Sequence, residues 1–322
     1  MRPNNDAPPD LAVFLGASSV IETSLTALAG AESLTDDLAV YLLESLDLPR
    51  PQALITALHS CNFVVERNSE WHLAPNARSH LIDRLQQRTE LRNAVHGRLL
   101  EIAQNSGLRR EFSEVPRYLN EGAGRAYHLS ALNASSGLRE YVKLAVSGEM
   151  GQQWLGSRLA EEQQRLGMLP PDSIEISFLR GMVYYRERRH AEAEPIFRAV
   201  ASSAENRIEV AIALHIVGSI DAKRRRSKLA EEELRRSVWI GAKIGEIFHR
   251  AQALHTLGRM LGGSTSRRTA EAEKLLRESR ELLRSRKDLP SEAQVLHTLG
   301  QLIGRNRNRA SEAEELLRQS LQ

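Results

Sequence analysis

Apolar residues recur at three- and four-residue spacing along most of this chain, and the clearest stretch occurs twice. Residues 251–258 read Ala-Gln-Ala-Leu-His-Thr-Leu-Gly, and residues 293–300 repeat this octapeptide with Val295 in place of Ala253. Looser copies surround Gly218 and Gly181. Each glycine precedes a basic turn and then a second amphipathic segment rich in alanine and glutamate. The pattern predicts helical hairpins that recur about every 40 residues and stack as a solenoid.

Small residues in both segments of a repeat have a packing reason. Gly218 is followed twelve residues later by Ala230, and the later repeats place glycine and alanine similarly. Two antiparallel helices approach closely where the residues at their crossing are small, while larger side chains such as Leu254 and Leu276 fill the space beside them. Each repeat is therefore expected to be one helical hairpin.

Two serines of the last repeat predict where its helices begin. Ser291 precedes Gln294 by three residues, and Ser311 precedes Glu314 by three residues. This spacing matches a capping box, in which the serine lies at the helix start.

These repeats resemble the tetratricopeptide family over residues 171–322. The resemblance lies in the Leu-Gly pair of the first helix, in Tyr184 three residues after Gly181, in the alanine of the second helix, and in Pro290 before a new repeat. The period of about 40 residues is longer than the 34 typical of that family. The resemblance implies an α-solenoid whose concave groove holds a segment of a protein partner.

The N-terminal part of the chain has a different order of elements. Residues 1–10 are proline-rich and predict disorder, and residues 11–29 are interpreted as one helix. An acidic start after Thr35 and a stop at Pro49 bound a second helix, and Pro51 starts a third. Alternating residues 63–67 and 71–73 predict a β-hairpin, followed by a helix over residues 76–87.

This order resembles the winged-helix domain that follows the nucleotide-binding core of signal-transduction ATPases with numerous domains. The resemblance rests on residues 53–58, on Phe63-Val-Val65 and on the Pro75, Arg78 and Leu81 spacing. The chain departs from that family because it contains no G-x-x-x-x-G-K-[ST] motif and carries Ala74 where the family has a nucleotide-sensing histidine. The predicted domains are an arm over 1–32, a winged-helix-like domain over 33–90, a helical connector over 91–170 and repeats over 171–322.

Charge and cysteine content narrow the functional classes. Residues 171–322 carry 28 Lys/Arg and 21 Asp/Glu, which leaves 16 and 20 for residues 1–170, so the basic character belongs to the repeats. Cys61 is the only cysteine, which excludes an intramolecular disulfide framework and a zinc cluster of the CxxC type. The sequence has no apolar run of about 20 residues that could span a membrane. A cytoplasmic location is therefore expected.

Three histidines occupy the same place in successive repeats, three residues before the glycine. Equivalent positions of stacked helices lie about 10 Å apart, which is too far for one metal ion with ligands at about 2 Å. The resemblance places these residues in the partner-binding groove, whereas the alternative is that each histidine merely packs on the neighbouring repeat. The candidate groove residues are His215, Gln252, His255, Arg259, Gln294, His297 and Gln301.

Basic residues gather in the turn between the two helices of each repeat. Because such turns stack along one edge, they could form a ridge that binds nucleic-acid phosphates or an acidic protein face. The alternative is a set of solvated turns balanced by the glutamates just beyond them. The residues of this basic edge are Arg186, Arg188, Arg189, Arg224, Arg225, Arg226, Arg267, Arg268, Arg305, Arg307 and Arg309.

The sequence contains no catalytic or cofactor-binding constellation, so we expect a non-catalytic interaction scaffold without cofactor or metal. Its expected partner is a protein segment in the solenoid groove, within a bacterial-type regulatory or defence signalling assembly. The alternative is a transcription regulator that binds DNA through the winged helix or nucleic acid along the basic edge. The leucines of the last helix, Leu316, Leu317 and Leu321, also predict a homo-oligomeric or partner contact at that helix.

Overall fold

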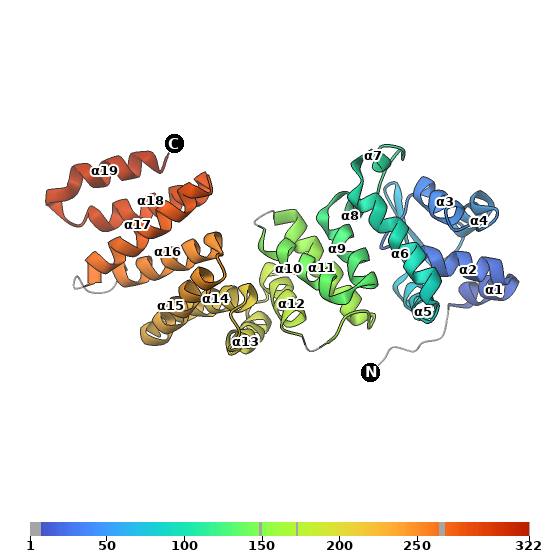
Figure 1. Cartoon of the computed structure of the whole chain (residues 1–322), viewed down its shortest axis with the longest axis horizontal. Coiled ribbons are helices and arrows are strands. Elements are labelled where there is room, and N and C mark those ends of the chain that lie inside the picture. The colour runs from blue at the N-terminus through green and yellow to red at the C-terminus, as the bar shows by residue number, and fades with distance from the viewer. Residues whose placement is uncertain (1–7, 148–149, 172, 264–267, 322) are drawn as a thin grey trace. The chain divides into compact units, whose positions relative to one another are not determined.

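The structure, a computed structural model, describes residues 8–147, 150–171, 173–263 and 268–321 (Figure 1). It is mainly α-helical, as the apolar periodicity predicts, and its described residues form one two-stranded sheet. The chain divides into two compact units, Met1–Glu187 and Arg188–Gln322, called unit 1 and unit 2 below. The sequence-based boundaries after residues 32, 90 and 170 stay predictions.

Unit 1 begins with two helices where the sequence predicted one. Helix α1 (Pro9–Ala17) ends at Ala17, and α2 (Ser19–Leu28) begins after Ser18. The Ser18 side chain accepts a hydrogen bond from the Ile21 N–H at 3.1 Å, which satisfies one of the free donors at the start of α2. A single capping serine therefore breaks the predicted helix. The predicted disorder of the first residues falls mostly on 1–7, outside the described residues.

The next elements follow the predicted order closely. They are α3 (Asp36–Glu44), α4 (Pro51–Leu58), β1 (Val64–Arg67), β2 (Glu70–Leu73) and α5 (Pro75–Gln87). The two strands pair antiparallel with Val64 opposite Leu73. Trp71 also pairs with Leu34, the residue before the N-cap Thr35 of α3, through two backbone hydrogen bonds of 2.8 Å. The sheet is thus tied to the start of α3.

The rest of unit 1 is helical. Helices α6 and α9 pack together, α10 and α11 pack in turn on α9, and α12 packs on α10 and α11. Gly137 on α10 permits a very close approach, since a Cβ there would lie 2.2 Å from the Ser130 Cα. The elements are α6 (Thr89–Gln104), α7 (Ser106–Arg109), α8 (Arg117–Asn120), α9 (Gly122–Leu132), α10 (Ala134–Val146), α11 (Met150–Arg165) and α12 (Ile174–Arg186).

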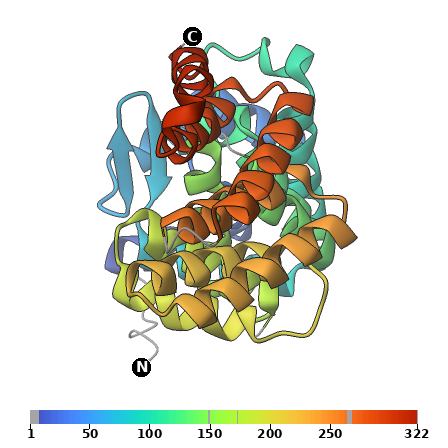
Figure 2. The same cartoon turned by 90° about the vertical axis from the view of Figure 1, so that its left-hand side faces the viewer.

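Unit 2 is a helical solenoid of successive antiparallel helices (Figures 1 and 2). Its first helix, α13, packs on α14. From α14 onward the described helices form three hairpins, α14 with α15, α16 with α17 and α18 with α19. The elements are α13 (His190–Ala201), α14 (Ile208–Lys223), α15 (Ser227–Lys243), α16 (Ile247–Gly263), α17 (Thr269–Ser285), α18 (Leu289–Ile303), a 3-10 turn η2 (Arg307–Arg309) and α19 (Ala310–Gln319).

The repeated glycines lie where the two helices of a hairpin cross, as predicted. A Cβ at Gly258 would lie 2.8 Å from the Leu276 side chain and 3.1 Å from the Ala272 carbonyl oxygen. Gly218 stands in the same relation to Leu234, and Gly300 to Leu317. The glycine therefore makes room for a leucine of the partner helix, and the backbones of the two helices can approach each other closely.

The predicted helix starts of the last repeat are wrong. Helix α18 begins at Leu289, and its cap is Asp288, whose side chain accepts from the Ser291 N–H at 3.1 Å. Helix α19 begins at Ala310 after Arg309, which makes no side-chain cap, so Ser311 lies inside it. The aspartate occupies the cap position that the serine was expected to take.

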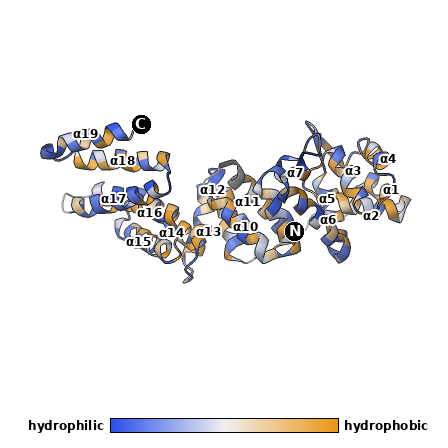
Figure 3. Cartoon of the chain, turned by 45° about the horizontal axis from the view of Figure 1, so that its top comes forward, coloured by the Kyte–Doolittle hydropathy of each residue, from blue (hydrophilic) through white to orange (hydrophobic). Residues whose placement is uncertain are grey.

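Figure 3 shows polar and apolar residues alternating along the helices of unit 2, as expected when each helix buries one face. Among the described residues, no helix combines the length and the apolar character needed to cross a membrane.

Candidate functional site

The predicted groove residues lie on the first helices of the hairpins in unit 2. Gln252, His255 and Arg259 share one face of α16, because they are spaced by three and four residues. The same spacing places Gln294, His297 and Gln301 on one face of α18. We call these six residues the polar face. Arg259, Gln294, His297 and Gln301 are exposed, and Gln252 and His255 are partly buried.

Two of the three histidines bond to the following hairpin. The His215 Nε2 atom on α14 lies 2.9 Å from the Thr256 Oγ1 atom on α16, and the His255 Nε2 atom lies 2.8 Å from the Thr298 Oγ1 atom on α18. Each histidine therefore contacts the threonine that follows the histidine of the next repeat. This is the neighbour-repeat packing that the sequence left open as the alternative to a groove.

Burial sets the charge state of these two histidines, and hydrogen bonding sets the position of the proton on His255. Burial lowers the pKa of His215 to about 3 and that of His255 to about 4, so both are neutral near pH 7. The Thr298 hydroxyl donates to the Gln294 carbonyl oxygen at 3.0 Å. Its oxygen must then accept from His255, whose proton therefore lies on Nε2. His255 orients α16 against α18.

His297 is placed differently from its two equivalents. It is exposed, and its Nε2 atom lies 2.9 Å from the Gln301 side-chain nitrogen one turn away on α18. With Gln294 and Arg259 it leaves a row of exposed polar groups on two neighbouring helices. Whether this row binds a partner stays a prediction.

Part of the basic edge is paired with glutamates. Arg268 donates to both carboxylate oxygens of Glu231 at 2.6 and 2.7 Å, and Arg309 does the same to Glu273 at 2.7 and 2.8 Å. These bidentate bonds lower the pKa of both glutamates to about 2. Arg224 pairs with Glu194 in the same way, at 2.7 and 2.8 Å. The glutamates thus neutralise three predicted edge residues.

Two of these pairs belong to closed rings of alternating charge. In the first, Glu231 and Arg235 of α15 join Glu271 and Arg268 at the start of α17. In the second, Glu273 and Arg277 of α17 join Glu312 and Arg309 at the start of α19. We call them the charge rings. Because each ring links the second helices of adjacent hairpins, the edge contributes to stacking.

The remaining edge residues have mixed surroundings. Arg305 donates to the Gly262 carbonyl oxygen, and Arg226 lies 3.5 Å from Asp221. Arg225 and Arg307 are exposed and form no ion pair with another described residue. Arg267 lies outside the described residues. Arg186 belongs to unit 1, whereas Arg188 and Arg189 begin unit 2. A continuous nucleic-acid ridge stays a prediction.

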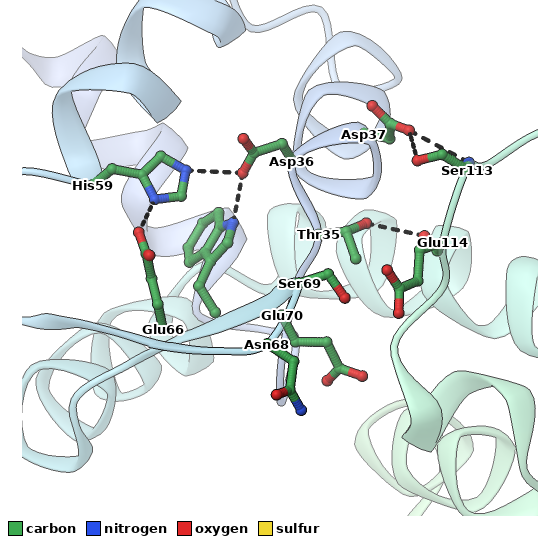
Figure 4. Close-up of a pocket in the computed structure, with 11 residues that line it drawn as sticks. Thr35, Asp36, Asp37, His59, Glu66, Asn68, Ser69, Glu70, Ser113 and Glu114 are labelled. Atoms are coloured by element: carbon green, nitrogen blue, oxygen red, sulfur yellow. Dashed lines mark hydrogen bonds and ion pairs between the residues drawn. The ribbon is translucent and has the colours of Figure 1, made fainter.

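An acidic pocket of about 240 Å³ lies in unit 1 between α3, the sheet and the 113–114 segment (Figure 4). His59 bridges Asp36 and Glu66, and Trp71 also donates to Asp36 at 2.8 Å. Burial lowers the pKa of His59, but its bonds to the two carboxylates outweigh burial and raise it. The Glu70 carboxylate accepts from Ser33. These carboxylates hold the pocket's own walls together.

A buried polar cluster that no sequence pattern predicts lies elsewhere in unit 1. Arg78 of α5 is buried and donates to the Ala29 and Ala31 carbonyl oxygens at 3.3 and 3.1 Å, to the Tyr127 hydroxyl and to Glu162. It joins four segments far apart along the chain. In the sequence, Arg78 stands out only through its spacing from Pro75, because no local pattern reveals partners so far away along the chain.

Two fully buried histidines continue this cluster. The His96 and His128 Nδ1 atoms are 2.9 Å apart, so one ring donates to the other. Burial lowers the pKa of His96 to about 3 and holds that of His128 well below its usual range. The described residues contain no group of three or more metal-ligating side chains.

The comparisons with known proteins support the fold. No protein-family model and no curated protein matches the sequence. A solved structure from Pyrococcus horikoshii, of a signal transduction ATPase with numerous domains (STAND) protein with a tetratricopeptide repeat sensor, is similar with a TM-score of 0.56 and 14% identity. The similarity covers 98% of this chain and 47% of that protein, so the chain spans about half of its length. The chain therefore has the helical-repeat fold of tetratricopeptide proteins.

Proposed function

We propose that the chain is a non-catalytic interaction protein whose polar face binds a segment of a protein partner. The observation that supports this proposal is the exposure of Arg259, Gln294, His297 and Gln301 at repeated positions on α16 and α18. The His255 bond to Thr298 orders the two helices, so a partner would meet a preformed row of donors and acceptors.

The likeness to a repeat sensor adds a biological setting to the proposal. That protein carries a tetratricopeptide repeat sensor. By analogy, this chain would act in a cytoplasmic regulatory or defence signalling assembly. The order of α3, α4, the β-hairpin and α5, with the Leu34 and Trp71 pairing, supports a winged-helix-like domain at residues 33–90.

DNA binding through that domain is the alternative function, and the local charges disfavour it. The exposed side chains of α4 include Gln52, Ala53 and Thr56 but no cation. The adjacent pocket carries Asp36, Glu66 and other carboxylates. Because DNA phosphates require cationic contacts, this surface would repel a duplex.

Affinity capture with the full chain tests the proposal. Wild type, the triple variant Arg259→Ala/His297→Ala/Gln301→Ala and the control Lys274→Ala/Glu281→Ala serve as baits, and captured proteins are identified by mass spectrometry. The control residues are exposed on α17. We expect the triple variant to lose at least tenfold in affinity for a protein that wild type and control retain equally.

Equal retention by all three baits would refute the polar face as the binding site. A gel shift in parallel tests the alternative: a sequence-specific DNA complex that persists at physiological salt would replace the protein-binding proposal with DNA recognition.

A further inference from the structure

The hairpin of α14 and α15 differs from the two later hairpins at a pair of inner positions. Asp221 follows Gly218 by three residues, and Glu233 follows Ala230 by three residues. In the later hairpins the positions equivalent to these two hold aliphatic residues, namely Leu261 with Leu275 and Ile303 with Leu316. The first hairpin therefore replaces an aliphatic pair with two carboxyl groups, which we call the carboxyl pair.

Both members of the carboxyl pair are removed from water. Asp221 is fully buried, and only 13% of the Glu233 side chain is exposed. Arg198 of α13 contacts both, at 2.9 Å from the Asp221 Oδ1 atom and 3.4 Å from the Glu233 Oε1 atom. The Glu233 Oε2 atom is buried and has no hydrogen-bond partner among the described residues. One acceptor at this junction is thus unsatisfied when the carboxyl group is ionised.

The missing charge ring explains why Arg198 points inward. Its equivalents Arg235 and Arg277 pair with a glutamate at the start of the next second helix. At the equivalent position near the start of α15 the chain has Leu229, so Arg198 has no carboxylate partner at this position. Arg198 instead joins α13 to the carboxyl pair and to Glu194.

The charges facing Glu233 come from every neighbouring element. Helix α13 contributes Arg198 and Glu194, α14 contributes Asp221, and Arg226 in the following turn lies 3.5 Å from Asp221. Arg224 in that turn is bound to Glu194. On α15 itself, Glu232 adds to the negative potential, whereas Arg236 donates to the Ala201 and Ser203 carbonyl oxygens of the α13 end.

We propose that Asp221 and Glu233 share one proton, which fastens the junction of α13, α14 and α15 and whose loss loosens it. With the proton on Glu233, its O–H donates to the Asp221 carboxylate and the unpartnered oxygen is satisfied. Without it, two negative charges lie side by side in a water-poor site, where Arg198 contacts both and Arg226 reaches only Asp221, which is unfavourable. The device makes the first junction of unit 2 responsive to pH.

The direction of the response follows from the titration. Burial, and then the Asp221 charge, raise the pKa of Glu233 from 4.5 to about 7. The folded junction therefore holds a proton that the unfolded chain has already released above pH 4.5. Its stability relative to the unfolded chain falls as the pH rises from about 4.5 to 7, and the population of the loosened junction grows near neutrality.

The test compares the full wild-type chain with Glu233→Gln, which keeps a donor but cannot ionise, and with Asp221→Leu/Glu233→Leu, which restores the aliphatic pair of the later hairpins. Carboxyl carbon resonances of glutamate are titrated by NMR, and amide protection factors of α13 to α15 are measured between pH 6 and 8. We expect one glutamate to titrate near pH 7 in the wild-type chain and in neither variant. We also expect the amide protection factors of α13 to α15 in the wild-type chain to fall at least tenfold over this pH range relative to both variants.

Three results would overturn the proposal. These are a Glu233 resonance that titrates near pH 4.5, a near-neutral glutamate titration that persists in Glu233→Gln, and an unchanged pH dependence in the double leucine variant. Since all three chains keep every histidine, histidine titration cancels in the comparison.

Discussion

Unit 1 and unit 2 differ in where their polar interactions lie: in the interior of unit 1 and mainly at the edge of unit 2. In unit 1, Arg78, His96 and His128 are buried and join segments that lie far apart in sequence. In unit 2, the charge rings lie at the edge and recur with the repeat, while the centres of the two later hairpins are packed with glycine, alanine and leucine. The buried cluster occurs once and depends on every partner, whereas the rings divide a similar role among several partly exposed ion pairs. Substitutions should therefore act strongly in the first unit and mildly in the second.

Arg78→Met tests this difference between the units most directly and should have the largest effect. The substitution leaves two backbone carbonyls, Glu162 and the Tyr127 hydroxyl without their donor. We expect it to lower the free energy of unfolding by about 3–5 kcal/mol in urea titrations. Arg98→Met, which removes an exposed pair with Glu101, is the control and should cost less than about 1 kcal/mol. Similar losses in both variants would contradict the distinction.

Acid should also destabilise unit 1 through its buried histidines. His96 and His128 are neutral when folded, because burial lowers their pKa values, whereas the unfolded chain protonates them below pH 6.5. Their contribution is complete above pH 6.5 and is lost progressively as the pH falls below this value, by about 1.4 kcal/mol per pH unit for each histidine. Urea titrations from pH 7 to 5 should show this slope in wild type, and His96→Leu/His128→Leu should lose it.

Gly258→Ala tests the packed centre of unit 2. Its new Cβ would meet the Leu276 side chain at 2.8 Å, and we expect a loss of about 1–3 kcal/mol in thermal unfolding. Gly97→Ala on α6 is the matched control, because a Cβ there meets nothing within 4 Å. Since alanine favours helix over glycine, the control should gain up to about 1 kcal/mol. A destabilised control would show that the helix environment, not the crossing, decides the outcome.

Opening a charge ring should have a smaller and salt-dependent effect. Glu273→Gln removes the bidentate acceptor of Arg309 and is expected to cost about 1 kcal/mol at low salt. The loss should shrink in 1 M NaCl, where the Debye length is about 3 Å. Glu314→Gln is a suitable control, because Glu314 is exposed outside both rings. A salt-independent loss would point to packing instead of charge.

The smallest effect concerns a turn residue of unit 2. Arg225 has φ of 61°, a left-handed conformation that glycine adopts without strain, as Gly245 does at φ of 71° in the turn between α15 and α16. Arg225→Gly should therefore stabilise the chain by up to about 1 kcal/mol, and Gly245→Ala should destabilise it by a similar amount. Thermal unfolding of both variants checks the two opposite signs.

The sequence predicted unit 2 better than unit 1 for a physical reason. Helical hairpins follow from local spacing, and the Gly258 and Leu276 contact lies within one repeat. The β-hairpin was placed within one residue at the ends of its strands, because alternation is also local. The partners of Arg78 lie 47 to 84 residues away, and no local pattern identifies them.

The candidate site was only partly predictable from the same chain. Repetition identified His215, His255 and His297 as equivalent, and the structure separates two inter-repeat histidines from an exposed one. The threonines that follow His255 and His297 are the residues that bond to the histidine of the preceding hairpin. Their repetition after the histidine was the sequence signal for these bonds. The binding role of the polar face and the contact predicted at Leu321, which is exposed, stay predictions.

The charge rings and the histidine bonds join equivalent positions of adjacent hairpins, so each hairpin carries complementary halves of the same connection. Removal of residues 252–293 would leave Glu231 and Arg235 facing Arg309 and Glu312, and His215 facing Thr298, in the places that Arg268, Glu271 and Thr256 now occupy. Such a hairpin is a cassette: gene duplication or deletion in register could lengthen or shorten the array while each new junction finds its matching groups already in place.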